Sequence, residues 1–429
     1  MRAPPAFDAV GAASPPVPTE ELPTMRLRDR PYAGASVIYV VDGLADAALD
    51  RLPEALSAYV LHPASIEVRD SLGRAPRDSD VAAAVEEAVV RIERYADVRD
   101  LIARARALGY GRLPVRVVIA GGTLVVNVHH GVMDGGAILE LVTWLVSVSS
   151  GADGKRDTRT PLAFPLVHGL RKVGRAGLED FRANRRTPQP EPVLTHSPTD
   201  ADLRLETARF GHATLGPDEL RRLIALPAGG PTTVMSRVAS LAVGAARRLY
   251  TGERDVPVIV PVDSRRFVKN ARVLGNFMGV AAPAALLASD WSPAAIAARS
   301  KAALRGGGAM VSTAHALARW IAHRPKTLLR RSPRPGPGTV AVFVPMLGLS
   351  EAFLGAAWRE GASPWIGGAT VSAWPSGTAL SLLAAGDEYQ ISAWDESGLF
   401  EVSDRTLAEA LAAELAEREV AAGIGPAVV

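Results

Sequence analysis

The sequence predicts a mixed α/β protein built from two halves of similar organisation. At 429 residues the chain is too long for one ordinary hydrophobic core, and two domains of roughly 200 residues are usual at this length. Hydrophobic residues make up 48% of the chain and charged residues 22%, which is typical of a globular protein. In each half, strand-like runs are followed by runs with helical spacing. Together these observations favour two similar α/β layers.

The first half, residues 26–183, follows a proline-rich N-terminal arm, residues 1–25, that we expect to be flexible or extended. Its expected elements are a buried strand at 34–44, a helix at 45–61, a helical stretch at about 79–107, two strands within 114–130 and a helix directly after them. Gly121 and Gly122 separate the last two strands, and a Gly-Gly pair between β-branched runs predicts a hairpin.

A linker is predicted at residues 184–200, where four prolines occur in seventeen residues and no periodicity is present. The second half, residues 201–429, repeats the strand and helix order of the first without repeating its sequence. Its expected elements are a strand at 203–215, helices at 216–226 and 233–250, strands at 256–263 and 339–346, a hairpin at 378–396 around Gly386-Asp387 and a helix at about 404–418.

Composition excludes several classes of function. The net charge is +3, from 48 basic and 45 acidic residues, so we expect no nucleic-acid partner. The chain has no cysteine, which excludes disulfides, thiolate metal sites and a cysteine nucleophile. Prolines interrupt the N-terminus where a signal peptide needs an apolar core, and no apolar run is long enough to form an integral membrane segment. A cytoplasmic location is therefore expected.

The segment VNVHHGVMDGGAILELV, residues 126–142, concentrates chemically active side chains between a strand and a helix. His129 and His130 end the strand pattern, and Asp134 and Gly135 follow. Adjacent residues on a strand project to opposite faces, so the two histidines cannot both bind one metal ion unless the backbone turns sharply between them. No glutamate stands at the spacing of a metal motif. No metal site is expected. One histidine can face a cavity as a base, or both can be packed at the strand end.

Two motifs in this order resemble one family. HHGVMDG, residues 129–135, fits H-H-x-x-x-D-G, and IVPVDSRRFVKNARVLGNFMGV, residues 259–280, is similar to a P-V-x-x-R…G-N-F segment. The chain thereby resembles the chloramphenicol-acetyltransferase-like superfamily, which includes condensation domains, polyketide-associated acyltransferases and wax-ester synthase/diacylglycerol acyltransferases. The D-F-G-W-G segment of the plant branch is absent, which leaves the branch open. The resemblance implies two such domains in a V-shaped pseudo-dimer, with the active site in a tunnel between them.

The resemblance also implies a role for each motif residue. His130 is the catalytic general base, and His129 is its oriented neighbour. Asp134 is a structural carboxylate that pairs with the arginine of the second motif, Arg265, with Arg266 as the alternative partner. Gly135 permits a close turn.

The activity that this resemblance implies is transfer of an acyl group from a thioester to a hydroxyl or amine of a small-molecule acceptor. The donor is acyl-CoA or the phosphopantetheinyl thioester of an acyl-carrier protein, which would be a partner, and no cofactor is bound. Trp374, Ser376 and Asn276 are expected to contact substrate. Arg330 and Arg331 belong to a basic cluster that suits a phosphate or an acidic carrier, or else form a solvated face. A catalytically silent binding or docking module is the alternative function.

Overall fold

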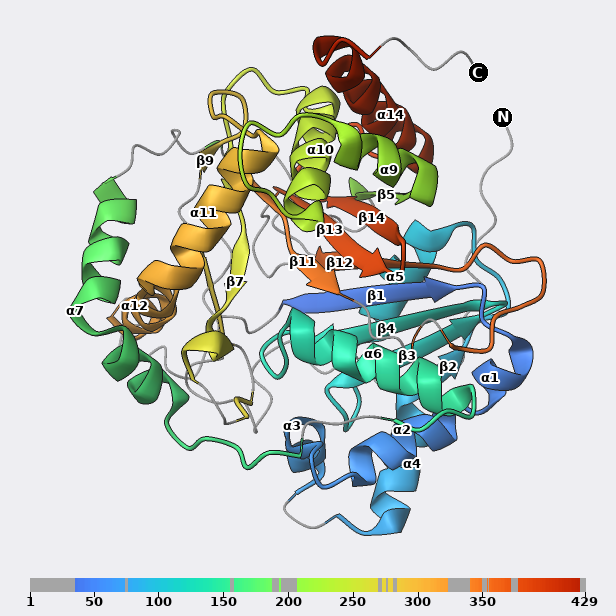
Figure 1. Ribbon diagram of the computed structural model, residues 1–429. Helices are drawn as coiled ribbons and strands as arrows, with labels where there is room; N and C mark the ends of the chain where they lie inside the picture. Colours follow the sequence, from blue (N-terminus) through green and yellow to red (C-terminus); the bar gives the residue numbers. More distant parts are fainter. Residues whose placement is uncertain are drawn as a thin grey trace.

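The computed structural model describes most of the chain, and Figure 1 shows its helices and strands. The described residues are 35–73, 76–154, 158–186, 193, 207–268, 272–274, 277–280, 284–322, 340–348, 353, 355–371 and 377–424. The predicted arm, residues 1–25, lies outside them, and so does the predicted linker, residues 184–200, apart from 184–186 and 193. The division into domains at that linker stays a prediction.

A five-stranded sheet forms the first half. Its order is β12-β1-β4-β3-β2, where β1 is Ser36–Asp42, β2 is Val89–Arg91, β3 is Val115–Ala120, β4 is Thr123–His129 and β12 is Trp365–Val371. β3 and β4 form the predicted antiparallel hairpin, and Gly121 adopts a φ of 57° in its turn, a conformation that favours glycine. β1 lies between β4 and β12 and is antiparallel to both, and β4 is the central strand of the sheet.

Helices cover both faces of this sheet. One face carries α1 (Asp46–Asp50), α2 (Leu52–Leu61), α4 (Asp78–Ala88) and α6 (Gly135–Ser149), which share a core with Val126 and Val128 of β4. The short α3 (Ile66–Arg69) and η2 (Asp70–Leu72) follow α2. The other face carries α5 (Val98–Ala107), which packs around Val125. Because both faces are covered, the strands read as continuous apolar runs rather than as alternating patterns.

A second, larger sheet forms the other half. Its order is β5-β14-β13-β10-β6-β9, and β11 also pairs with β13; the strands are β5 (Arg209–Leu215), β6 (Pro257–Ile259), β9 (Ala284–Ala285), β10 (Ala341–Phe343), β11 (Met346–Gly348), β13 (Gly377–Ala385) and β14 (Glu388–Asp395). Four helices bury their apolar residues against it: α9 (Pro217–Ala225), α10 (Val234–Leu249), α11 (Pro293–Gly306) and α14 (Asp404–Ala421). The two halves therefore have separate cores.

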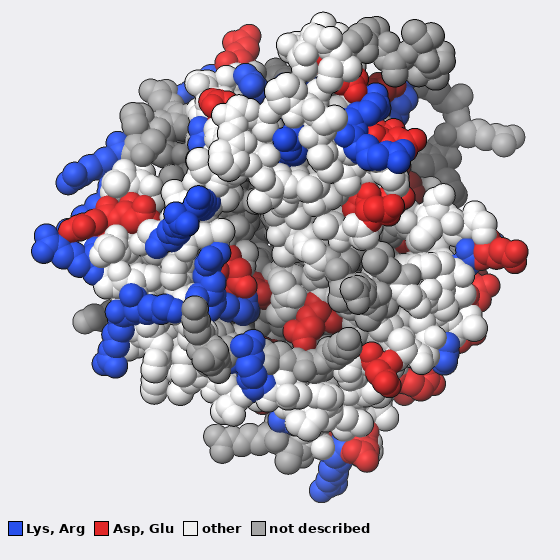
Figure 2. Space-filling model, in the orientation of Figure 1, with Lys and Arg blue, Asp and Glu red and all other residues white. Residues whose placement is uncertain are grey.

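Strand β12 joins the two halves. It comes from the second half of the sequence but pairs with the whole of β1 in the first sheet. The backbone N–H of Gly368 donates to Ser392 Oγ of β14 at 2.8 Å, and a Cβ added at Gly367 would lie only 3.1 Å from Ser392 Cβ. The two glycines thus allow the sheets to meet closely. Figure 2 shows the surface hollowed between the halves near the centre of the view.

A third cluster of elements lies to the left in Figure 1. It contains α7 (Pro165–Arg186), α12 (Gly308–Ala322), β7 (Pro261–Asp263), η3 (Ser264–Phe267) and β8 (Met278–Val280). β7 and β8 pair with each other in a two-stranded sheet. Phe267, Phe277 and Met310 form a small core here, covered by Leu166 and Leu170 of α7. This core holds the segment that carries Arg265.

Most expected elements are confirmed, and four are corrected. The strand at 339–346 is divided into β10 and β11, because residues 344–345 between them do not belong to a strand. The helical stretch at 79–107 is interrupted by β2, because Val89 and Val90 pair in parallel with β3. The helix at 45–61 is divided at Arg51, before a new helix that has proline in its first turn. The strand at 256–263 becomes β6 and β7, which belong to different sheets. Among the described residues, no helix combines the length and the apolar character needed to cross a membrane.

Candidate active site

β4 ends at His129, which is fully buried on the α5 side of the sheet. Its Nδ1 accepts a hydrogen bond from the backbone N–H of Gly131 at 3.0 Å, and its ring meets Tyr110 edge to face with centroids 5.4 Å apart. The Tyr110 hydroxyl donates to Asn127 Oδ1 at 2.9 Å and lies 2.6 Å from Ser36 Oγ. These contacts fix His129 as a packed neighbour of the next residue.

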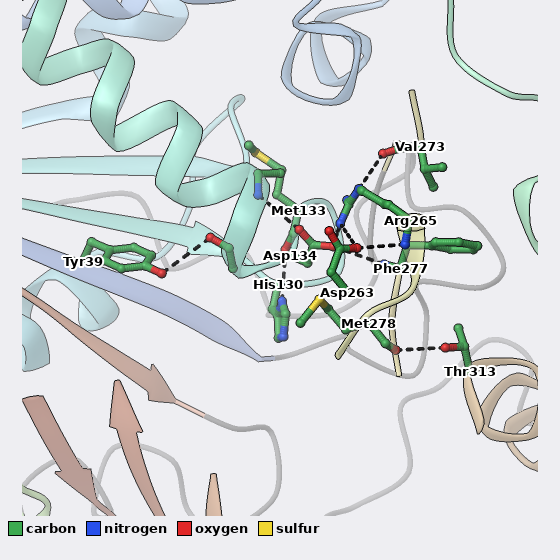
Figure 3. Close-up of polar contacts among 12 residues, drawn as sticks. Tyr39, His130, Met133, Asp134, Asp263, Arg265, Val273, Phe277, Met278 and Thr313 are labelled. Atoms are coloured by element: carbon green, nitrogen blue, oxygen red, sulfur yellow. Dashed lines mark hydrogen bonds and ion pairs between the residues drawn. The ribbon is translucent and has the colours of Figure 1, made fainter. Parts of the chain in front are cut away.

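His130 follows in the turn after β4, and its ring is held by the backbone. Its N–H donates to the carbonyl oxygen of Ala35 at 2.9 Å, and its Nδ1 lies 3.0 Å from the carbonyl oxygen of Met133. A carbonyl oxygen only accepts, so in the neutral ring Nδ1 carries the proton and Nε2 is the basic nitrogen. In Figure 3 the second ring nitrogen points away from Asp134.

The surroundings of His130 keep the imidazole neutral. Burial lowers its pKa below the ordinary value, although the Met133 carbonyl and the charge of Asp134 act in the opposite direction. At neutral pH the ring is therefore predominantly in the form that can accept a proton. A base in this state is suited to general-base chemistry.

Asp134 is fully buried, and both its oxygens accept hydrogen bonds. Oδ1 caps α6 by accepting from the backbone N–H of Ala137 at 3.1 Å. Oδ2 accepts from Arg265 Nη1 at 2.5 Å and from the backbone N–H of Phe277 at 3.2 Å. Burial alone would raise the pKa of Asp134, but the charge of Arg265 and these hydrogen bonds hold it below its usual value. The carboxylate is thus committed to structure and is a poor proton acceptor.

Arg265 reaches Asp134 from η3, in the second half of the chain. Its side chain is 25% exposed, and its Nε donates to the carbonyl oxygen of Val273 at 3.3 Å. Burial would lower the pKa of Arg265, but the carboxylates of Asp134 and Asp263 raise it, so the guanidinium stays charged. Arg266 is exposed, and Arg265 is the arginine that contacts Asp134. Figure 3 shows this pair beside His130.

Comparisons with known proteins place this geometry in a known fold. No protein-family model and no curated protein matches the chain. Among solved structures, polyketide synthase associated protein 5 from Mycobacterium tuberculosis is 18% identical, with a TM-score of 0.54 over 94% of this chain and 98% of that one. The condensation domain of the monacolin K polyketide synthase MokA is 14% identical, with a TM-score of 0.51 over 90% and 92%. The chain has the condensation-domain fold.

A third structure with this fold is TRI3, a trichothecene 15-O-acetyltransferase from Fusarium sporotrichioides, at 12% identity and a TM-score of 0.51 over 91% of this chain and 92% of that one. At these identities the likeness is one of fold. The predicted architecture of two α/β units in a pseudo-dimer is confirmed. In this condensation-domain fold His130 and Asp134 come from the first half, and Arg265 and Phe277 come from the second.

A second buried ion pair crosses between the halves close to the site. Arg272 Nη2 donates to Glu67 Oε2 at 3.1 Å, and both side chains are buried. Arg272 Nη1 also donates to the carbonyl oxygen of Ala64, and the Arg272 carbonyl accepts from the backbone N–H of Leu162 at 2.9 Å. Sequence reasoning missed this pair. One indication was present in the sequence: Arg272 lies within the second motif segment, at a position that the P-V-x-x-R…G-N-F pattern does not specify.

Tyr39 is another residue that the sequence did not single out. It lies on β1, and its hydroxyl donates to the carbonyl oxygen of Gly135 at 3.5 Å. Burial and the nearby charge of Asp134 raise its pKa, so the phenol stays protonated. The turn at Gly135 is made without a positive φ, and a Cβ added there would lie 3.9 Å from Tyr39 Oη, an ordinary contact. The packing of the chain itself therefore does not require glycine at this position.

Five predicted site residues lie outside the described residues: Asn276, Arg330, Arg331, Trp374 and Ser376. Their substrate-binding and donor-binding roles stay predictions. Within the described ranges, no group of three or more His, Asp or Glu side chains is placed to hold a metal ion.

Proposed function

We propose that this chain transfers an acyl group from a thioester donor to a hydroxyl or amine acceptor, with His130 as the general base. The donor is acyl-CoA or an acyl group on the phosphopantetheine of a carrier protein. The observation that carries the proposal is the hydrogen bond from His130 Nδ1 to the Met133 carbonyl, which makes Nε2 the basic nitrogen of a neutral ring. Two structures with the same fold, a polyketide synthase associated protein and a trichothecene acetyltransferase, support a role in specialised-metabolite or lipid biosynthesis.

The proton that moves in each step of the proposed reaction has a named donor and a named acceptor. Nε2 of His130 accepts the proton of the acceptor hydroxyl or amine while the acceptor oxygen or nitrogen attacks the thioester carbonyl. The tetrahedral intermediate collapses, the carbon–sulfur bond breaks, and the imidazolium returns its proton to the departing thiolate. General-base catalysis of this kind contributes about 10²–10⁴-fold to the rate, and the alignment of both substrates contributes the remainder.

The charged groups around His130 fit this division of roles. Asp134 cannot serve as the base without giving up Arg265 and the Phe277 N–H. Because the base acts directly on the acceptor, the reaction needs no covalent acyl-enzyme, and the chain has no cysteine that could form a thioester. His130 is thus the residue on which the proposal depends.

A panel of donors and acceptors tests the proposal. Acyl-CoA and acyl-pantetheine thioesters of increasing chain length are incubated with hydroxyl and amine acceptors, and released thiol and product mass are recorded. We expect thiol release that depends on an acceptor, together with an ester or amide of matching mass. If donors raise the melting temperature but no thiol is released with any acceptor, the chain is a binding or docking module and the proposal fails.

A further inference from the structure

Positive charge is concentrated on three helices at one edge of the molecule. α7, α11 and α12 together contain ten basic and two acidic residues, a net charge of +8. The whole chain carries +3, so the remainder of the sequence carries −5. In Figure 2 lysine and arginine side chains project along the left of the view, the side on which α7 and α11 lie in Figure 1. The molecule is therefore strongly polarised although its net charge is small.

α7 is kinked at Gly174 (φ 52°, ψ −142°), and the outer face of its two segments presents most of this charge. Its exposed basic residues are Arg171, Lys172, Arg175, Arg182 and Arg186. Arg175 is 90% exposed and pairs with Glu179 on the same face at 2.7 Å. The other acidic residue of the helix, Asp180, turns inward, where its Oδ2 accepts from the backbone N–H of Gly308 at 2.8 Å. The outer face thus keeps a large excess of positive charge.

Large apolar side chains share this outer surface. Phe164, directly before α7, is 70% exposed, which is the highest value among the exposed large hydrophobic residues of the described chain. Val167 and Leu178 of α7 are exposed as well. None of the three contributes to a core, because the inner face of α7 is already formed by other residues, including Leu166 and Leu170.

α7 is firmly attached to the rest of the protein through its inner face. Leu166 and Leu170 pack on the core formed by Phe267, Phe277 and Met310. Phe277 donates its backbone N–H to Asp134, so this helix is one packing layer away from the site of His130. A contact made by the outer face of α7 would therefore hold the candidate active site at a fixed place relative to the surface that is bound.

We propose that the outer face of α7, with the adjoining basic residues of α11, binds the surface of an anionic membrane. Basic side chains close to an anionic leaflet attract it electrostatically, and apolar side chains among them insert at the boundary between headgroups and acyl chains. The charge spreads over both segments of the kinked α7 at an outer edge of the molecule, which suits a broad anionic plane better than the acidic helix of a small protein. This inference goes beyond acyl transfer and does not depend on it.

Co-sedimentation with lipid vesicles tests the proposal on the full chain. The probes are vesicles of phosphatidylcholine with about 30% phosphatidylglycerol, and vesicles of phosphatidylcholine alone. We expect binding to the anionic vesicles, weaker binding at about 0.5 M salt and little binding to neutral vesicles. Each basic residue near an anionic surface changes the affinity about 5-fold, so Arg171→Glu/Arg175→Glu should weaken binding by at least about 20-fold. Phe164→Ser should weaken binding without any change in charge.

A matched control separates this surface from net charge. Arg221→Glu/Arg405→Glu alters two exposed arginines on α9 and α14 and changes the net charge by the same amount, and it should leave vesicle binding nearly unchanged. Thermal melting must show that the variants are folded. The proposal is overturned if the control variant loses as much affinity as the α7 variant, or if the wild type does not bind anionic vesicles. Binding to an acidic carrier protein without vesicle binding would assign the surface to a protein partner and also overturn it.

Discussion

The carboxylate of Asp134 and the guanidinium of Arg265 lie 2.5 Å apart, although 131 residues separate them in the sequence. Asp134 caps the helix that follows His130, and Arg265 belongs to the other half of the molecule. The pair therefore fixes the surroundings of the candidate base by a contact between the halves. The contribution of this pair to the free energy of unfolding can be measured.

Arg265→Ala should destabilise the protein by roughly 3–5 kcal/mol, because Asp134 is then left fully buried without its cationic partner. Asp134→Ala should cost less, because Arg265 is 25% exposed and still lies 3.4 Å from the carboxylate of Asp263. The double substitution should cost less than the sum of the two, since it leaves no unpaired charge. Chemical denaturation of the four proteins in a double-mutant cycle measures this coupling. Strictly additive free energies would show that the two residues do not act as a pair.

The second bridge, between Glu67 and Arg272, should behave in the same way. Glu67→Ala should cost roughly 3–5 kcal/mol, because Arg272 is then buried without its carboxylate. The matched control is Asp50→Ala, which removes the exposed pair with Arg91 and should cost at most about 1 kcal/mol. Equal losses in urea unfolding would mean that burial does not determine the strength of these pairs.

The pH dependence of acyl transfer should report the titration of His130. Burial lowers its pKa, so the base is neutral at pH 7 and becomes protonated only at a pH below the ordinary imidazole value of about 6.5. The kcat/KM for transfer should accordingly be flat near neutrality and fall on the acid side with an apparent pKa under that value. An acid limb centred above about 6.5 would contradict this account of the site.

Reversal of Arg330 and Arg331 to glutamate should raise the KM for the thioester donor and leave the KM for the acceptor nearly unchanged. CoA phosphates and acidic carrier helices are both attracted by positive charge, and the effect should shrink at high salt because exposed charges are screened over about 8–10 Å. Steady-state kinetics at two ionic strengths measures both constants. Unchanged donor kinetics would identify the cluster as a solvated face.

Much of the core architecture could be predicted from local pattern. β4, its hairpin and α6 follow from a β-branched run, a Gly-Gly turn and an apolar helical run, all of which are local signals. The contact between Asp134 and Arg265 was predicted from two motifs, since spacing alone does not bring together residues so far apart. Arg265, and not the exposed Arg266, faces the carboxylate because η3 and the Val273 carbonyl orient it.

Features that depend on distant partners could not be predicted. β2 looks helical in sequence and becomes a strand only because β3 lies beside it. β12 comes from the second half of the sequence and pairs with β1 at the edge of the first sheet, and its own residues do not predict this pairing. Glu67 and Arg272 are ordinary charged residues until the fold buries them together. Each of these features depends on tertiary contact rather than on local propensity.

The measurement that tests the central claim most directly is the rate of acyl transfer by His130→Ala. If Nε2 of His130 is the general base, the rate should fall by at least about 10²-fold while the melting temperature stays close to that of the wild type. His129→Ala should reduce the chemical step less, because its ring is packed against Tyr110 and bound to the Gly131 N–H. A folded His130→Ala protein that keeps more than about a tenth of the wild-type rate would contradict the assignment of His130 as the base.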